Sequence, residues 1–190
     1  TGMLDCLNIL ETRRSLAPHL MVGPGPTSTE LEHILRIACR VPDHGKLEPW
    51  RFIVFEGQGR DKASALIADI FRADHPEADA KQIEIESVRL SRAPLVIGVI
   101  SSLKESAKIP EWEQLLSAGA VCMALTVAAS TLGFVTAWLT EWYAYDRRVL
   151  TALGLAPHER IAGFIHIGRR SHVSEERKRP NLSEIVSVYA

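Results

Sequence analysis

Residues 36 to 55 read RIACRVPDHGKLEPWRFIVF and join the end of a patterned helix to an apolar strand. Between these two segments lie five charged or polar side chains within nine positions: Arg40, Asp43, His44, Lys46 and Glu48. Pro42 and Pro49 flank this group, and each proline fixes its own φ and restricts the residue before it, so we expect a stiff loop. A stiff polar loop on a helix–strand frame is typical of a binding site, although an ordinary connection with solvated charges would have the same sequence pattern.

The segment before this loop predicts an amphipathic helix. Thr27 and Glu30 have the spacing of a capping box, which marks a helix start. An apolar stripe at helical spacing follows and ends before Pro42, comprising Leu31, Ile34, Leu35 and Ala38. After the loop, residues 50–55 predict a strand.

The rest of the chain predicts helices alternating with a few further strands. We expect helices over 5–12, around 63–71, and over 77–90, 111–132 and 146–153, and strands over 95–100, 134–139 and 161–167. Gly57 and Gly59 follow a strand, but position 62 of the dinucleotide-binding motif holds Lys62, which excludes that motif. With no dividing linker, we predict an α+β fold with a mixed sheet in one domain over 3–190.

Composition excludes several classes of partner. Of the 190 residues, 46% are hydrophobic and 24% charged, and the formal net charge is −1, so we expect neither nucleic acid nor membrane as a partner. We expect no leader and no apolar run of membrane-spanning length. Cys6, Cys39 and Cys122 are widely spaced among apolar neighbours, which suggests buried thiols in a reducing, cytoplasmic compartment and no metal site.

Phosphate-binding potential is the chemistry that recurs. Arg13 and Arg14 precede Ser15 at a helix end, where they could complement the helix dipole or clamp a phosphate. Cations recur at Arg177 and Arg179. No nucleophile or base stands out, because the carboxylate pairs Glu84/Glu86 and Glu111/Glu113 have the pattern of exposed helix faces. This profile suits a bound cofactor that carries the chemistry while the protein orients it, so we predict no catalytic side chain.

These residues together resemble the FMN-dependent nitroreductase superfamily, in its compact branch with a Pro-Asp-His loop. The resemblance spans residues 4–189 and has four landmarks, in family order: Arg13-Arg14-Ser15, the loop 42–50, the segment 112–138 and the late basic pair Arg177 and Arg179.

The resemblance implies an intertwined homodimer with two FMN sites at its interface. It implies that Arg13, Arg14 and Ser15 hold the FMN phosphate and ribityl chain, with further phosphate contacts from Arg177 and Arg179. It also implies that Arg40, His44 and Lys46 reach the flavin from the partner subunit, and that Trp138, Leu139 and Thr140 line the other side of the flavin. The helix over 111–132, rich in small residues, would then lie at the dimer interface.

The implied function is that of an oxidoreductase that passes hydride from NAD(P)H through FMN to a nitro compound, a quinone or a similar small molecule. One departure leaves an alternative open: where many members have a Lys or Arg two positions after the serine, this chain has Ala17. The alternative is a flavin-binding protein for storage, sensing or flavin fragmentation, without nicotinamide-driven reduction. A third interpretation is a dimer that binds no cofactor.

Overall fold

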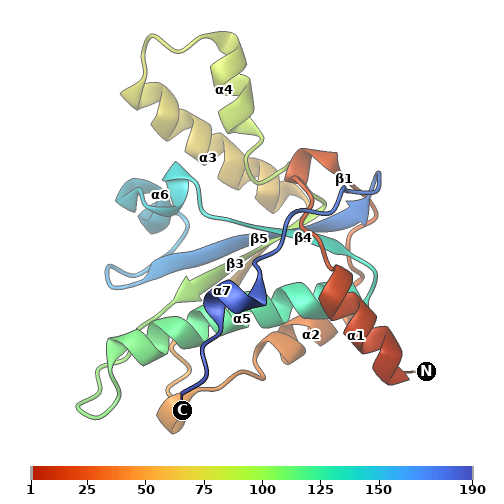
Figure 1. Cartoon of the computed structure of the whole chain (residues 1–190). Coiled ribbons are helices and arrows are strands. Elements are labelled where there is room, and N and C mark those ends of the chain that lie inside the picture. Colours follow the sequence, from red (N-terminus) through yellow and green to blue (C-terminus); the bar gives the residue numbers. More distant parts are fainter. Residues whose placement is uncertain (1, 190) are drawn as a thin grey trace.

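One β-sheet lies between two layers of helices (Figure 1). The structure, a computed structural model, describes residues 2–189, and side chains from residue 6 onward. The strands are β1 (Met21–Val22), β2 (Trp50–Phe55), β3 (Leu95–Ser101), β4 (Val135–Leu139) and β5 (Arg160–Arg170). The α+β class is therefore confirmed.

Strand β5 is the centre of the sheet. It pairs with β3 over residues 160–167, with β4 over residues 164–168 and with β1 at residues 169–170. Strand β2 pairs with the other side of β3. We expected a mixed sheet, but every pairing among the described residues is antiparallel. Because β4 pairs with residues 164–168 only, the part of β5 at 160–163 has no described strand on that side.

The helices divide between the two faces of the sheet. On one face lie α1 (Gly2–Thr12), α2 (Ser28–Ala38) and α5 (Glu111–Thr131), and on the other α3 (Gln58–Asp74), α4 (Ala80–Ser87) and α6 (Arg147–Ala152) (Figure 1). Successive side chains of a strand point to opposite faces. Accordingly Leu95, Ile97 and Val99 join the core under α2 and α5, whereas Val96 and Ile100 join the core under α3 and α6.

Most predicted elements are confirmed, with small changes of boundary. The capping box of Thr27 and Glu30 begins α2, and β2 covers the predicted residues 50–55. The helix predicted over 77–90 is shorter, because Asp79 caps it and it ends at Ser87. The two-residue strand β1 was missed, since two residues carry no periodicity.

Helix α5 differs from one expectation of the sequence analysis. By length and composition alone it could cross a membrane, whereas we expected no such segment. Half of that apolar window is buried, and α5 packs against β3, β4 and β5. Its apolar character is therefore that of a core helix.

The cysteines also differ from expectation. Cys122 is buried in α5, as predicted, but Cys6 and Cys39 are exposed in this chain. The prediction rested on apolar neighbours in the sequence and on wide spacing, and these do not show whether a thiol faces the core or the solvent.

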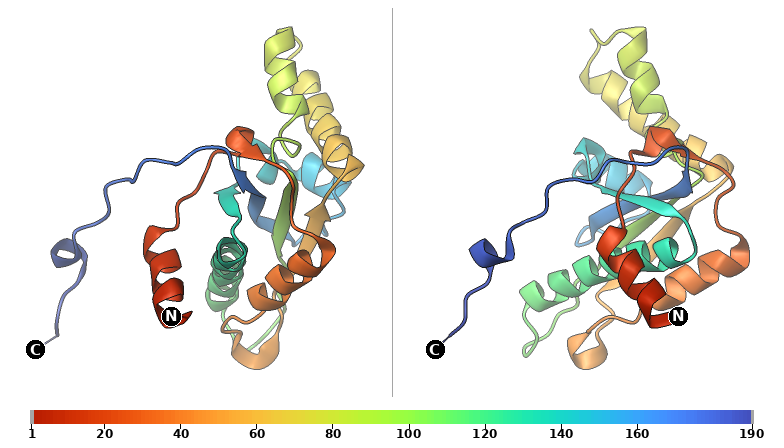
Figure 2. Two further views of the ribbon diagram at one scale, coloured as in Figure 1. Left: turned by 90° about the vertical axis from the view of Figure 1, so that its right-hand side faces the viewer. Right: turned by 45° about the vertical axis from the view of Figure 1, so that its right-hand side comes forward.

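The C-terminal tail extends away from the sheet (Figure 2). It contains the short helix α7 (Leu182–Ile185) and exposes several large apolar side chains: Val173, Leu182, Ile185, Val186, Val188 and Tyr189. Exposed apolar side chains concentrated in one segment indicate an interaction surface.

Candidate cofactor site

The chain after α1 is fixed beside β4. The backbone N–H of Leu16 donates to the carbonyl of Thr136 at 3.2 Å, and the Leu16 side chain is buried. This anchor places Arg13 and Arg14 at the mouth of a cavity of about 200 Å³. The cavity is lined by Ile9, Thr12, Arg13, Arg14, Ser130, Gly133, Phe134, Val135 and Arg170.

Four guanidinium groups from the two ends of the chain converge here. Partial burial lowers the pKa of Arg13, and the positive charges of Arg179, Arg14 and Arg177 lower it further. The structure thus brings together the early and late arginines that the sequence analysis singled out. Ser15 lies beside them and is exposed.

One acidic residue partly offsets this charge. Glu176 pairs with Arg179 at 2.8 Å and lies 3.8 Å from Arg14, whose Nε also donates to the Glu175 carbonyl at 3.0 Å. The four arginines, with Arg170 also lining the cavity, outnumber this carboxylate and leave a surplus of positive charge. Glu176 was not among the predicted site residues, because an acidic side chain is no signal of a phosphate site.

The loop 42–50 is held rigid by Asp43. Its carboxylate accepts hydrogen bonds from the backbone N–H groups of Leu47 at 3.1 Å and Glu48 at 2.9 Å. Lys46 and Glu48 have positive φ angles of 55° and 48°, which side chains rarely adopt. Such backbone strain persists only where surrounding contacts enforce it, and it concentrates at functional sites.

The predicted partner-facing residues Arg40, His44 and Lys46 are all exposed. His44 Nδ1 lies 2.7 Å from a carboxylate oxygen of Glu113 on α5. A groove of about 330 Å³ runs from His44 along α5, past Leu116 and Ala120.

Within one chain, the arginine cluster and this loop lie far apart. Ser130 lines the arginine cavity and Glu113 pairs with His44, and both residues belong to α5. At 1.5 Å of rise per residue, they are roughly 25 Å apart along the helix. The two groups of a single chain are therefore separate.

The third predicted group ends β4. The Trp138 indole lies over Gly163 of β5, where any Cβ would overlap it, and its Nε1 donates to the Ala162 carbonyl at 3.0 Å. Leu139 and Thr140 follow and are half-buried. Trp138 is 44% exposed, so its ring remains available to a bound molecule.

The arginine cluster has the chemistry of a phosphate site. Guanidinium groups bind phosphate through paired, charge-assisted hydrogen bonds, and a dianion would relieve the repulsion among four neighbouring cations. The residues present thus fit the FMN phosphate.

Comparison with known proteins shows which family the chain belongs to and which solved structures share its fold. The model of the nitroreductase family matches residues 10–169. The Escherichia coli (strain K12) protein named "Putative NAD(P)H nitroreductase YdjA" is 36% identical over 165 residues, covering 87% of this chain and 88% of that protein.

Solved structures of other proteins share the fold, and two of them are compared with this chain. A nitroreductase-like family protein from Bacillus cereus superposes with a TM-score of 0.81 at 23% identity, covering 97% of this chain and 95% of that one. The FMN-dependent nitroreductase NfnB from Mycobacterium smegmatis, solved in complex with NADPH, has a TM-score of 0.77 at 15% identity, with full coverage of both chains.

The three-layer fold is that of the solved nitroreductases, and the arginine cluster has the charge and the donors to hold a phosphorylated molecule. It belongs to the nitroreductase family, as the sequence resemblance predicted.

Proposed function

We propose that this protein is an FMN-dependent oxidoreductase built as one domain over 3–190. The observation that carries the proposal is the convergence of Arg13, Arg14, Arg177 and Arg179 beside an open cavity, in a member of this family. A bound flavin would supply hydride transfer from NAD(P)H to a nitro compound, a quinone or a similar small acceptor.

The chain's own part is to bind and orient. Arg13, Arg14 and Ser15, with Arg177 and Arg179, would hold the phosphate and ribityl chain, and Trp138, Leu139 and Thr140 would flank the ring. No side chain is assigned a proton transfer, so the predicted absence of a catalytic residue remains part of the proposal.

The proposed assembly is an intertwined homodimer. Helix α5 exposes an apolar stripe that includes Leu116 at 55% and Met123 at 42%. A two-fold dimer with antiparallel α5 helices would bring the loop with Arg40, His44 and Lys46 to the arginine cluster of the other copy. The roughly 25 Å separation within one chain supports this arrangement.

The tail and the sheet edge provide a second argument for the dimer. Residues 160–163 of β5 lack a described neighbouring strand on one side, and the large apolar side chains of the tail are exposed among residues 6–189. An unpaired edge invites pairing with another chain. We propose that the tails exchange between subunits, and that the protein acts in the cytoplasm without a nucleic-acid or membrane partner.

The test is anaerobic reduction of FMN-loaded protein by NADH or NADPH, followed by addition of a nitroarene or quinone. We expect the flavin absorbance to bleach with at least one nicotinamide and to return on adding the acceptor. If FMN is retained but neither nicotinamide bleaches it, the flavin-binding alternative replaces this proposal.

A further inference from the structure

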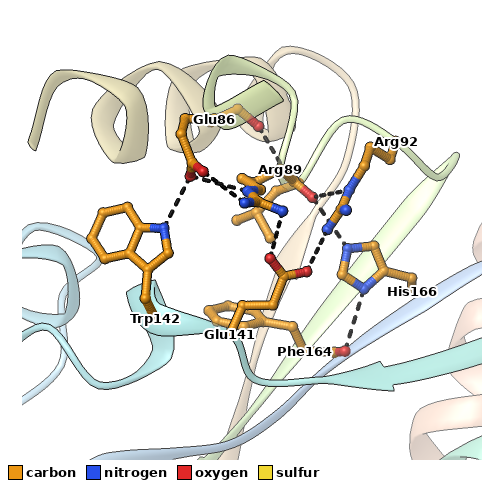
Figure 3. Close-up of polar contacts among 9 residues, drawn as sticks. Glu86, Arg89, Arg92, Glu141, Trp142, Phe164 and His166 are labelled. Carbon is orange, nitrogen blue, oxygen red and sulfur yellow. Dashed lines mark hydrogen bonds and ion pairs between the residues drawn. The ribbon is translucent and has the colours of Figure 1, made fainter. Parts of the chain in front are cut away.

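A charge-balanced network lies between the end of α4 and the turn that follows β4 (Figure 3). Arg89 forms two hydrogen bonds to the Glu86 carboxylate at 2.6 and 3.0 Å, and its NH1 pairs with Glu141 at 2.6 Å. Arg92 pairs with the other oxygen of Glu141 at 2.9 Å. We expected Glu86 on an exposed helix face, but it is only 5% exposed. Arg89 and Trp142, which cover it, lie outside α4 and therefore do not show in the pattern of that helix.

The network spans three parts of the fold. Glu86 also accepts a hydrogen bond from the Trp142 indole at 3.0 Å. The Arg89 carbonyl lies 3.3 Å from Nε2 of His166 on β5. Together these contacts fasten the base of the projecting α3–α4 hairpin to β5 and to the turn that follows β4 (Figure 3).

Glu141 has a backbone conformation that needs such support. Its φ of 54° and ψ of 176° fall close to a region that is essentially restricted to glycine. A non-glycine residue remains there only when other contacts compensate for the strain. The paired arginines provide that compensation, since two ion pairs at low exposure hold the carboxylate from both sides.

The turn that Glu141 controls is the one assigned to the flavin. Thr140 precedes Glu141 directly, and within residues 2–189 the backbone N–H groups of Thr140 and Glu141 have no hydrogen-bond partner. Two adjacent free donors next to Trp138 are groups that a bound molecule with carbonyl or ring-nitrogen acceptors would engage. Two glutamates against two arginines leave no surplus charge, so the network itself attracts no anion.

We propose that Glu141, clamped by Arg89 and Arg92, is a positioning residue that fixes the Trp138–Thr140 segment and its free backbone donors against the flavin ring. The inference rests on the proposed FMN site. In this proposal Glu141 with Arg89 and Arg92 sets the geometry of the contact with the flavin ring. The distant arginine cluster provides the affinity for the phosphate.

The experiment compares Glu141→Gln and Glu141→Gly with the unchanged protein. Glutamine removes the charge, and glycine removes the clamp while fitting the backbone angles without strain. The matched control is Glu159→Gln, which breaks the ion pair of another buried glutamate, between Glu159 and the more exposed Arg51 at 2.6 Å. The readouts are the dissociation constant for FMN, the visible circular dichroism of bound flavin, and the Tm of the apo protein.

We expect both Glu141 variants to weaken FMN binding about tenfold and to alter the flavin dichroism, because glutamine loses both ion pairs and glycine loses the whole side chain. The control should lower the Tm while leaving the FMN constant and the dichroism unchanged. Equal FMN binding and dichroism in the Glu141 variants and the unchanged protein would overturn the inference alone, as would an equal effect of Glu159→Gln. Absence of FMN binding by the unchanged protein would overturn the proposed function and this inference with it.

Discussion

Arg13 is the residue on which the proposed phosphate site depends most, because it is half-buried among three other arginines. We predict that Arg13→Ala weakens FMN binding about tenfold to a hundredfold, since a hydrogen bond to a charged group contributes about 1.5–3 kcal/mol. Fluorescence titration of the apo protein with FMN measures this. Arg72→Ala, which removes an exposed arginine paired with Asp69 on α3, is the control and should bind FMN normally. Unchanged affinity in Arg13→Ala would remove the arginine cluster from the site.

His166 gives the stability of the protein a pH dependence. Burial lowers its pKa from 6.5 to about 4, against the hydrogen bond to the Arg89 carbonyl, which favours the protonated ring. Between these two values the unfolded chain binds more protons than the folded chain, so the contribution is complete above pH 6.5 and is lost as the pH falls toward 4.

The expected loss in the free energy of unfolding from this group is on the order of 3 kcal/mol. Urea denaturation at a series of pH values between 7 and 4 measures it. His166→Gln cannot titrate and should show a flatter profile over this range. An equally steep profile in His166→Gln would assign the pH dependence to other groups.

At the scale of the element, the loop 42–50 depends on Asp43. We predict that Asp43→Ala releases the backbone N–H groups of Leu47 and Glu48, and that Lys46 and Glu48 then leave their strained conformations. FMN affinity should fall several-fold while the Tm changes little, because the loop is largely exposed. Asp61→Ala, on α3, is a control that removes a carboxylate from another surface. If Asp43→Ala lowers the Tm by several degrees as well as the FMN affinity, the residue supports the fold and not the site.

The elements that sequence could predict are those whose signals are local. The capping box of α2, the apolar runs of β2 and β3, and the small residues of α5 each follow from a few neighbouring positions. The arginine pairs could be singled out by residue type, and the loop by its prolines. That the early and late arginines lie close together in space could be predicted only from the resemblance to a family, because residues 13 and 179 lie at opposite ends of the chain.

The missed features depend on contacts between distant positions. Glu86 has the pattern of a surface helix residue, and only the positions of Arg89 and Trp142 reveal that it is buried. Glu141 carries no signal of its positive φ, since the residue type disfavours that conformation. Strain of this kind is visible only in three dimensions.

At the scale of the whole molecule, one chain holds the two halves of the proposed site at opposite ends of α5. In the proposed homodimer a second copy brings them together, with the exposed stripe of α5 and the apolar tail as the surface for it. Cofactor binding and dimer formation should therefore be linked, with FMN stabilising the dimer by mass action.

The most direct measurement is gel filtration of the purified protein after incubation with FMN, with absorbance and light scattering recorded on the same peak. We predict a peak with the mass of a dimer that retains about one FMN per subunit and shows a flavin spectrum. A monomeric peak that retains FMN would contradict the shared site. A colourless peak would contradict the assignment of the arginine cluster and, with it, the proposed function.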